Sequence, residues 1–319
     1  MAEPVTSPVS EAAPETFTAA LWATNLARPL NGIGAWVAQV EEQMEEARAA
    51  GAELLVMPEY VSEQWLSFAP EGIAADEEIP WMAEQAEAAL EGLQGLAEKH
   101  GMALLAGTMP VRAENPKDGE PPYLNRAHLF LPDGRRSKQD KLCLTPGEMD
   151  PESWNLTTGD EIEIVEWKGM KMATLICLDI EMPALSQRLA KESLDLVLVP
   201  SMTSKLAGYG RVFSCAKARA VELQTAVLTC GVIGAASTNK PRETNISGAS
   251  VFVPCEEALG HRGVAGEEVP PQSAVEGPGP LLIARDLPIR LIRELRSGAA
   301  EVWPGAWTAD HVKIKRDSE

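Results

Sequence analysis

Three reactive side chains stand where predicted buried strands end. Glu59 follows the apolar run at 54–57, Lys141 closes an extended segment at 137–141, and Cys177 ends the apolar run at 173–176. A partly desolvated carboxyl has a raised pKa and can act as a general base. An ammonium can hold a developing oxyanion, and a thiol can attack an electrophilic carbon. Together these side chains supply the parts that catalysis by a cysteine nucleophile needs.

Each of these residues also has an ordinary structural interpretation. Glu59 can be a solvent-facing turn residue, Lys141 and Glu148 an exposed pair, and Cys177 a core cysteine. A predicted strand-to-helix turn after Cys177 favours the catalytic interpretation, because its free backbone N–H groups and positive helix end would lower the pKa of the thiol. Glu148 would hold the Lys141 ammonium in place.

Strands and helices that would position these residues alternate along much of the chain. Apolar runs predict strands at 17–25, 54–57, 102–108, 124–131, 137–141, 161–167, 171–176, 196–200, 226–231 and 281–284. Helical spacing predicts helices at 35–50, 81–99, 183–192, 211–223 and 288–296. Residues 255–280 are rich in Gly and Pro and read as loop. The order predicts an α/β fold with mixed sheets.

Composition excludes several other classes of protein. The 319 residues carry a formal charge of −19, which argues against binding nucleic acid or an anionic membrane surface. No apolar run approaches the roughly 18 residues of a membrane span. The five cysteines are widely spaced and the four histidines show no metal-ligand pattern, so we expect reduced thiols in the cytoplasm and no metal or other cofactor.

Composition also predicts three parts of the chain. Residues 1–15 are rich in Ala, Pro, Ser and Glu and are expected to be a disordered leader, without the basic start and apolar run of a secretion signal. Residues 16–296 would form the main domain. Residues 297–319, with Trp303 and Trp307, form a tail that could lie at a subunit interface.

Glu59, Lys141 and Cys177, in this order and at intervals of 82 and 36 residues, resemble the Glu–Lys–Cys set of the nitrilase, or carbon–nitrogen hydrolase, superfamily. The likeness extends to a strand-end segment at 199–203, an A-R-A-x-E-like helix at 217–222 and a G-x-S-like strand at 248–250. It covers about residues 16–296. The stretches 208–211 and 176–183 are most similar to a poorly characterised branch that is sometimes fused to an acetyltransferase domain.

The resemblance implies a four-layer αββα sandwich, paired as a homodimer or a higher homo-oligomer. It implies that Cys177 attacks the substrate and that Glu59 moves protons. Lys141 and the backbone N–H of Leu178 would hold the oxyanion. Glu148 would position the substrate or water and support Lys141.

Further residues are candidates for the substrate pocket. Many relatives have an aromatic residue after the cysteine, and Leu178 departs from that pattern. The pocket wall can therefore differ from that of relatives. We expect it to include residues close to the catalytic set or following the next strand: Tyr60, Trp65, Glu181, Met202 and Tyr209. Glu181 would bind a cationic group of the substrate, unless it makes a structural hydrogen bond or lies on the surface.

The predicted function is hydrolysis of a small linear amide to a carboxylic acid and ammonia or an amine. Four alternatives stay open at this point: a nitrilase, an N-carbamoyl amidase, an acyltransferase that passes the thioester to an amine, and a degenerate binding subunit. The presence of all four residues Glu59, Lys141, Glu148 and Cys177 weighs against the last.

Overall fold

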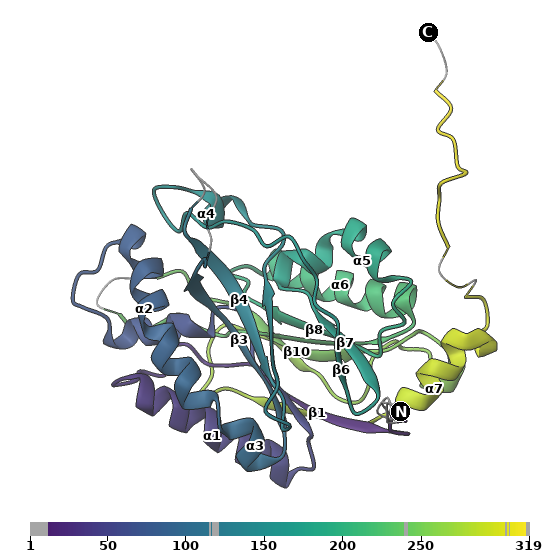
Figure 1. Ribbon diagram of the computed structural model, residues 1–319, viewed down its shortest axis with the longest axis horizontal. Coiled ribbons are helices and arrows are strands. Elements are labelled where there is room, and N and C mark those ends of the chain that lie inside the picture. Colours follow the sequence, from purple (N-terminus) through teal and green to yellow (C-terminus); the bar gives the residue numbers. More distant parts are fainter. Residues whose placement is uncertain are drawn as a thin grey trace, which may run out of the picture.

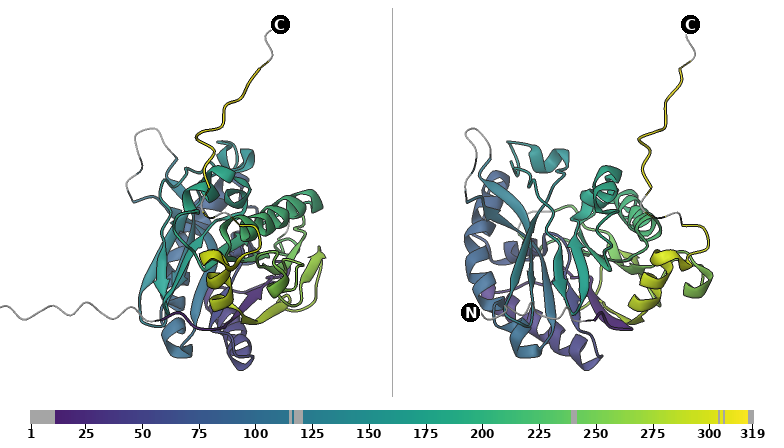
Figure 2. Two further views of the ribbon diagram at one scale, coloured as in Figure 1. Left: turned by 90° about the vertical axis from the view of Figure 1, so that its right-hand side faces the viewer. Right: turned by 45° about the vertical axis from the view of Figure 1, so that its right-hand side comes forward.

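Two six-stranded sheets lie face to face, and helices cover the outer side of each (Figures 1 and 2). The structure is a computed structural model that describes residues 12–114, 116, 121–238, 242–303, 305 and 307–316. The turned view in Figure 2 shows the layers from helix through two sheets to helix. The predicted four-layer αββα sandwich is confirmed.

The first sheet has the strand order β12-β1-β2-β3-β4-β5. Its strands are β1 Phe17–Trp22, β2 Leu54–Val56, β3 Ala103–Arg112, β4 Tyr123–Phe130, β5 Arg136–Asp140 and β12 Leu281–Leu287. The central strands β1, β2 and β3 are parallel, and β12, β4 and β5 run antiparallel to their neighbours.

The second sheet repeats this arrangement in the order β11-β10-β9-β8-β7-β6. Its strands are β6 Val165–Trp167, β7 Met170–Thr174, β8 Leu196–Ser201, β9 Ala226–Gly231, β10 Ser247–Phe252 and β11 Val269–Gln272. Strands β7, β8 and β9 are parallel, and the outer strands are antiparallel. Each sheet therefore has three parallel strands whose carboxyl ends can present side chains at one edge.

Helices on the two outer faces complete the sandwich. The first sheet is covered by α1 Ile33–Ala49, α2 Ala75–Leu93 and α3 Leu96–His100, and the second by α5 Pro183–Leu189 and α6 Leu206–Leu223. Shorter helical segments are η1 Val61–Phe68, α4 Pro146–Met149, η2 Cys177–Glu181, η3 Glu257–Leu259, α7 Ile289–Glu294 and η4 Leu295–Ala299.

Alternation along the central strands divides the apolar core into two parts. In β1, Ala19 and Leu21 face the second sheet, whereas Ala20 and Trp22 pack toward α1 and α2. Successive strand residues point to opposite faces, so a strand buried on both sides reads as an unbroken apolar run. This is why the sequence pattern locates these strands well.

Several element predictions differ from the structure. The helix predicted at 81–99 is divided into α2 and α3, and the strand predicted at 161–167 is only β6 Val165–Trp167. Helix α2 begins at Ala75 rather than 81, because three acidic residues favour its first turn. Pro80 lies inside this helix, where it removes one backbone hydrogen bond. Helix α6 begins at Leu206 rather than 211. Strand β11 lies in the segment predicted as loop, and its two prolines are compatible with an edge strand, which leaves N–H positions unused.

The two ends of the chain differ in their contacts. Residues 1–11 of the predicted leader lie outside the described residues, but Glu15 forms a salt bridge with Arg290 and Ala13 packs against the core. In the tail, Trp303 donates a hydrogen bond to the carbonyl of Glu222, and residues 307–316 project from the body (Figure 1). The domain boundaries and the subunit-interface role of the tail stay predictions.

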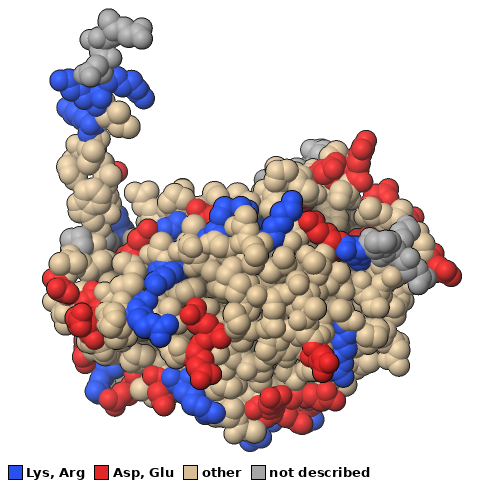
Figure 3. Space-filling model, turned by 180° about the vertical axis from the view of Figure 1, so that it is seen from behind, with Lys and Arg blue, Asp and Glu red and all other residues tan. Residues whose placement is uncertain are grey.

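Acidic side chains occur at several separate places on the face shown in Figure 3. Seen from behind, acidic side chains form several separate groups near the edges of the molecule, with basic side chains between them (Figure 3). Within the described part of the chain, every helix is too short or too polar to cross a bilayer.

Gly107 fixes the approach of β3 to the segment that carries Glu59. Its φ of 67° lies in the left-handed region, and an added Cβ would overlap the Pro58 carbonyl oxygen and lie 2.8 Å from Val61. We expect Gly107→Ala to destabilise the fold by about 2 kcal/mol or more, which would lower Tm by about 4 °C or more.

Gly210→Ala is the matched control for calorimetry, because an added Cβ there meets no described atom within 4 Å. Alanine is the better helix former, so Tm should hold or rise slightly. Equal Tm values for both variants would contradict the packing role of Gly107.

Candidate active site

A cavity of about 580 Å³ opens where several parallel strands end. Glu59 follows β2, Cys177 follows β7, and Met202 follows β8, and all three line this cavity. Lys141 reaches it from the end of β5. In α/β sheets, ligands commonly bind outside the carboxyl ends of the strands, and a cavity of this size suits a small molecule.

Three charged groups meet at the cavity floor. The Lys141 Nζ lies 2.8 Å from Glu59 Oε1 and 2.8 Å from each carboxylate oxygen of Glu148. All three side chains are buried, with at most 4% of any of them exposed. Glu59 lies 82 positions before Lys141 and Glu148 lies 7 positions after it, yet the three residues form one hydrogen-bonded ion cluster.

Neighbouring groups hold Glu148 firmly. The Tyr60 hydroxyl donates to Glu148 Oε1 at 2.7 Å, and the Thr145 hydroxyl and backbone N–H donate to Oε2 at 2.9 and 2.8 Å. Thr145 caps α4, so the short helix and the carboxylate stabilise each other. The Tyr60 ring also packs against Trp154, with centroids 4.6 Å apart.

The ion cluster separates the pKa values of its two carboxyls. Burial raises the pKa of Glu59 to about 7, although the Lys141 charge opposes it. Burial acts in the same direction on Glu148, but Lys141 and the hydrogen bonds from Thr145 and Tyr60 outweigh it and lower its pKa. Glu59 can therefore exchange a proton near neutral pH, whereas Glu148 stays ionised.

The same cluster keeps Lys141 charged. Burial by itself would lower the pKa of this ammonium, but the two adjacent carboxylates raise it above the usual value. A positive charge is therefore fixed beside the thiol at neutral pH.

Cys177 begins a strained turn. Its φ of 49° is left-handed, which is unusual for a residue with a side chain, and such strain is concentrated at functional positions. The Sγ atom lies 3.5 Å from the Met202 carbonyl oxygen. Leu178 follows in the first turn of η2, where backbone N–H groups have no partner within the helix.

The predicted lowering of the thiol pKa is wrong. Burial and the negative charge of Glu59 raise the pKa of Cys177 well above its usual value, and the Lys141 charge offsets only part of this. The five-residue 3₁₀ turn supplies too small a dipole to compensate for desolvation. The thiol is therefore neutral at rest and needs a base to become a nucleophile.

Asp179 connects the turn of Cys177 to the segment after Lys141. Its fully buried carboxylate accepts hydrogen bonds from the backbone N–H groups of Leu142, Cys143 and Ile176, at 2.7 to 3.2 Å for the nearest oxygen of each. Burial raises its pKa to about 6, against the effect of these donors. Sequence reasoning missed this role, although an acidic residue two positions after a strand-end cysteine was a usable signal.

Asn125 is a second residue that the sequence did not single out. It lies within β4, and its Nδ2 donates to Glu59 Oε1 at 2.9 Å, while its backbone carbonyl accepts from the Lys141 N–H at 2.9 Å. It therefore aligns both members of the ion pair. A polar residue inside a buried strand was the available signal.

The expected pocket residues divide into two groups. Tyr60 and Met202 line the cavity. Trp65 is fully buried away from it, with its ring edge-on to Trp36 at 5.2 Å. Glu181 forms a salt bridge with Arg211 at 3.2 Å, and Tyr209 packs on Phe213 at 4.0 Å.

Trp65, Glu181 and Tyr209 are absent from the described lining of the cavity, because core packing or a surface ion pair holds each of them elsewhere. Sequence reasoning also missed three charged residues that line the cavity, namely Glu63, Glu78 and Arg242. Arg242 lies more than 160 residues from both carboxylates, so no local pattern could connect them.

Comparison with known proteins places this fold and site in a family. The model of the carbon–nitrogen hydrolase family matches residues 29–254, which include the whole ion cluster and Cys177. The chain belongs to the carbon–nitrogen hydrolase family, and the predicted nitrilase-superfamily membership is confirmed.

Sequences with partial similarity include proteins named as hydrolases and amidases. The chain is 29% identical over 232 residues to a probable hydrolase, YhcX, of Bacillus subtilis, covering 73% of this chain and 44% of that protein. It is 28% identical over 217 residues to an (R)-stereoselective amidase of Pseudomonas, covering 67% and 66%. The match to the omega-amidase YafV of Escherichia coli has 26% identity over 185 residues, covering 58% and 63%. The chain thus spans less than half the length of the first relative. It spans about two thirds of the length of each of the other two.

Solved structures share the fold over nearly the whole chain. A nitrilase-superfamily amidase from Nesterenkonia AN1 superposes with a TM-score of 0.62 at 21% identity, covering 92% of this chain and 98% of that one. A further structure of that amidase gives a TM-score of 0.63 at 23% identity, covering 89% and 98%.

The site geometry predicts how the reactivity of Cys177 depends on pH. Because the thiol pKa is raised and Glu59 has a pKa of about 7, the thiol loses its proton to Glu59 only where that carboxyl is ionised. Alkylation of Cys177 by iodoacetamide should therefore rise about tenfold per pH unit up to about pH 7 and then level off.

Peptide mass spectrometry after timed alkylation measures this at Cys177 alone. In Glu59→Gln the step near pH 7 should be absent, leaving alkylation only at high pH. A wild-type profile that rises only above pH 9 would contradict the role of Glu59 as base.

Proposed function

We propose that this protein hydrolyses a small linear amide to a carboxylic acid and ammonia or an amine, through a thioester on Cys177. The observation that carries the proposal is the buried cluster of Glu59, Lys141 and Glu148 beside the thiol in one cavity. An amide has a poor leaving group, and a sulfur nucleophile divides its cleavage into two smaller barriers.

In the first step the Cys177 sulfur attacks the carbonyl carbon as Glu59 accepts the thiol proton. The carbonyl oxygen becomes an oxyanion held by Lys141 and the backbone N–H of Leu178. At rest Lys141 donates to both carboxylates, and protonation removes the negative charge of Glu59. Proton transfer thus weakens one bond to Lys141 at the moment when the oxyanion needs a donor.

The tetrahedral intermediate then collapses. Its C–N bond breaks, the nitrogen takes the proton from Glu59, and ammonia or an amine leaves a thioester behind. Glu59, ionised again, removes a proton from a water molecule that attacks the thioester. The C–S bond then breaks, the acid leaves, and Glu59 returns the proton to the Cys177 sulfur. Glu148 keeps its charge throughout and holds the ammonium in position.

Relatives support an amide as substrate over the alternatives. Three of the similar proteins are named as amidases. In one structure of the Nesterenkonia amidase, the acetamide moiety of fluoroacetamide is covalently added at the active-site cysteine. The cavity of about 580 Å³ suits a substrate of the size of a short linear amide.

Ammonia release from linear amides of three to six carbons tests the proposal. We expect Cys177→Ala to reduce kcat/KM to about one thousandth or less, because it removes the nucleophile. Lys141→Met should lose about a hundredfold or more, the usual effect of removing one oxyanion donor.

Cys255→Ala is the matched control, because this cysteine is exposed and does not line the cavity in the described residues. Its kcat/KM should equal that of wild type, and circular dichroism checks that each variant is folded. Normal turnover by a folded Cys177→Ala variant would refute the proposal, as would hydrolysis of nitriles with no hydrolysis of amides.

A further inference from the structure

The described lining of the active-site cavity has an excess of negative groups. Five carboxylates but only two cations line it. The carboxylates are Glu59, Glu63, Glu78, Glu148 and Glu243, and the cations are Lys141 and Arg242. Lys141 is shared by Glu59 and Glu148, which belong to the chemistry described above. Among the described lining residues, only Arg242 balances the three remaining carboxylates.

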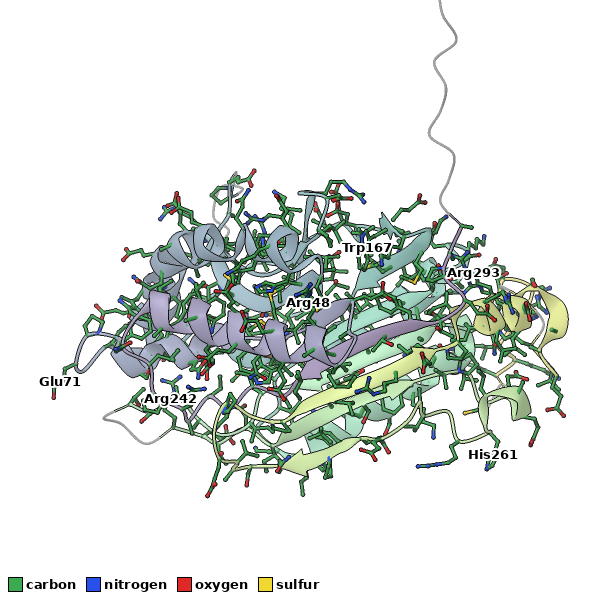
Figure 4. The ribbon with its side chains drawn as sticks, turned by 90° about the horizontal axis from the view of Figure 1, so that it is seen from below. Arg48, Glu71, Trp167, Arg242, His261 and Arg293 are labelled. Carbon is green, nitrogen blue, oxygen red and sulfur yellow. The ribbon has the colours of Figure 1, made fainter. Side chains whose placement is uncertain are left out.

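Arg242 is already committed to Glu78. Its two terminal nitrogens donate to the two oxygens of Glu78 at 2.6 and 3.1 Å, the bidentate geometry that guanidinium prefers. Figure 4 shows Arg242 near Glu71 at one end of the molecule, far from Arg293 at the other. A carboxylate on a substrate would have to displace Glu78 to gain the same contact.

Glu63 is the least compensated of the buried carboxylates in this lining. The one hydrogen bond that its side chain accepts from a described residue is a long contact of 3.4 Å from Arg242, although only 5% of the side chain is exposed. Burying a carboxylate without close partners is costly, and a cation supplied by a ligand would offset that cost.

Asn245 offers an independent sign of a missing donor. It lines the same cavity and is 1% exposed, and its Nδ2 donates to the Gly234 carbonyl at 2.9 Å. Its Oδ1 is buried and accepts no hydrogen bond from any described residue. Buried acceptors are nearly always satisfied, so an unpaired one beside a substrate cavity points to a donor on the ligand.

Building on the proposed amide hydrolysis, we infer that the cavity selects amides that carry a protonated amine remote from the scissile carbonyl, and that Glu63 is its main partner. An ammonium group has only donors, which matches the acceptors that Glu63 and Asn245 provide. The excess of carboxylates repels an anionic substrate and attracts a cationic one.

The electrostatics of Glu63 agree with this assignment. Burial, with a smaller contribution from the charges of Glu78 and Glu59, raises its pKa to about 7 against the opposing charge of Arg242. A bound cation would favour the ionised carboxylate. Glu181, the cation site expected from the sequence, is paired with Arg211 instead.

Three amides of similar length but different charge test the inference. 5-Aminopentanamide is cationic, hexanamide has a methyl group in place of the ammonium, and glutaramate is anionic. Ammonia release at low ionic strength gives kcat/KM for each. In the wild type we expect a preference of about tenfold or more for 5-aminopentanamide over hexanamide, with glutaramate the poorest substrate.

Glu63→Gln keeps the shape of the side chain and removes its charge, and it should reduce this preference at least about fivefold. Because the preference is a ratio, partial loss of folded enzyme does not change it. Glu87→Gln, at an exposed position of α2, changes the net charge equally and should leave the preference unaltered. A wild type that prefers hexanamide or glutaramate would overturn the inference, as would an unchanged preference in folded Glu63→Gln.

Binding to the Cys177→Ala variant separates this inference from the proposed function. If no amide is hydrolysed, the amidase proposal fails, and calorimetry still measures the affinity for each compound. Tighter binding of 5-aminopentanamide than of hexanamide, by about fivefold or more, supports the cation site. Equal or weaker binding overturns it.

Discussion

The structure depends on one buried cation held between two buried carboxylates. Lys141 would be too costly to bury alone, and so would Glu59 or Glu148, because each charge loses its hydration. Contacts of 2.8 Å on both sides compensate the ammonium and leave one negative charge in excess. Burial, together with that excess, keeps the pKa of Glu59 near 7 and leaves the thiol of Cys177 protonated until the base acts. Stability and reactivity of the site therefore come from the same three charges.

The fold makes this cluster possible by ending several strands at one place. Two sheets of the same strand pattern face each other, so β2 and β7 deliver Glu59 and Cys177 from opposite layers. Lys141 comes from the end of β5, and Asp179 joins its segment to the turn of Cys177 through three backbone N–H groups. Gly107 permits the close approach of β3 to the Glu59 segment. Apart from the local bond between Ile176 and Asp179, each of these contacts links parts of the chain that lie far apart in the sequence.

The sequence predicted the features that local patterns encode. Doubly buried strands appear as apolar runs, which located β2, β7 and β8 closely, and the residue set at their ends indicated the family and the sandwich. The pattern did not show where helix α2 starts or that 269–272 forms an edge strand, because Pro80, Pro270 and Pro271 suggest breaks that the tertiary structure tolerates. It also could not pair Arg242 with Glu63 and Glu78, because a three-dimensional contact over more than 160 residues leaves no periodic signal.

Detection of an acyl group on Cys177 tests the account most directly. A short linear amide is mixed with the enzyme, the reaction is quenched in acid within milliseconds, and peptides are mapped by mass spectrometry. The account predicts an added acyl mass on the peptide of Cys177, none on Cys143, Cys215, Cys230 or Cys255, and none in Cys177→Ala. An acyl group on another cysteine, or amide turnover that proceeds normally in Cys177→Ala, would contradict it.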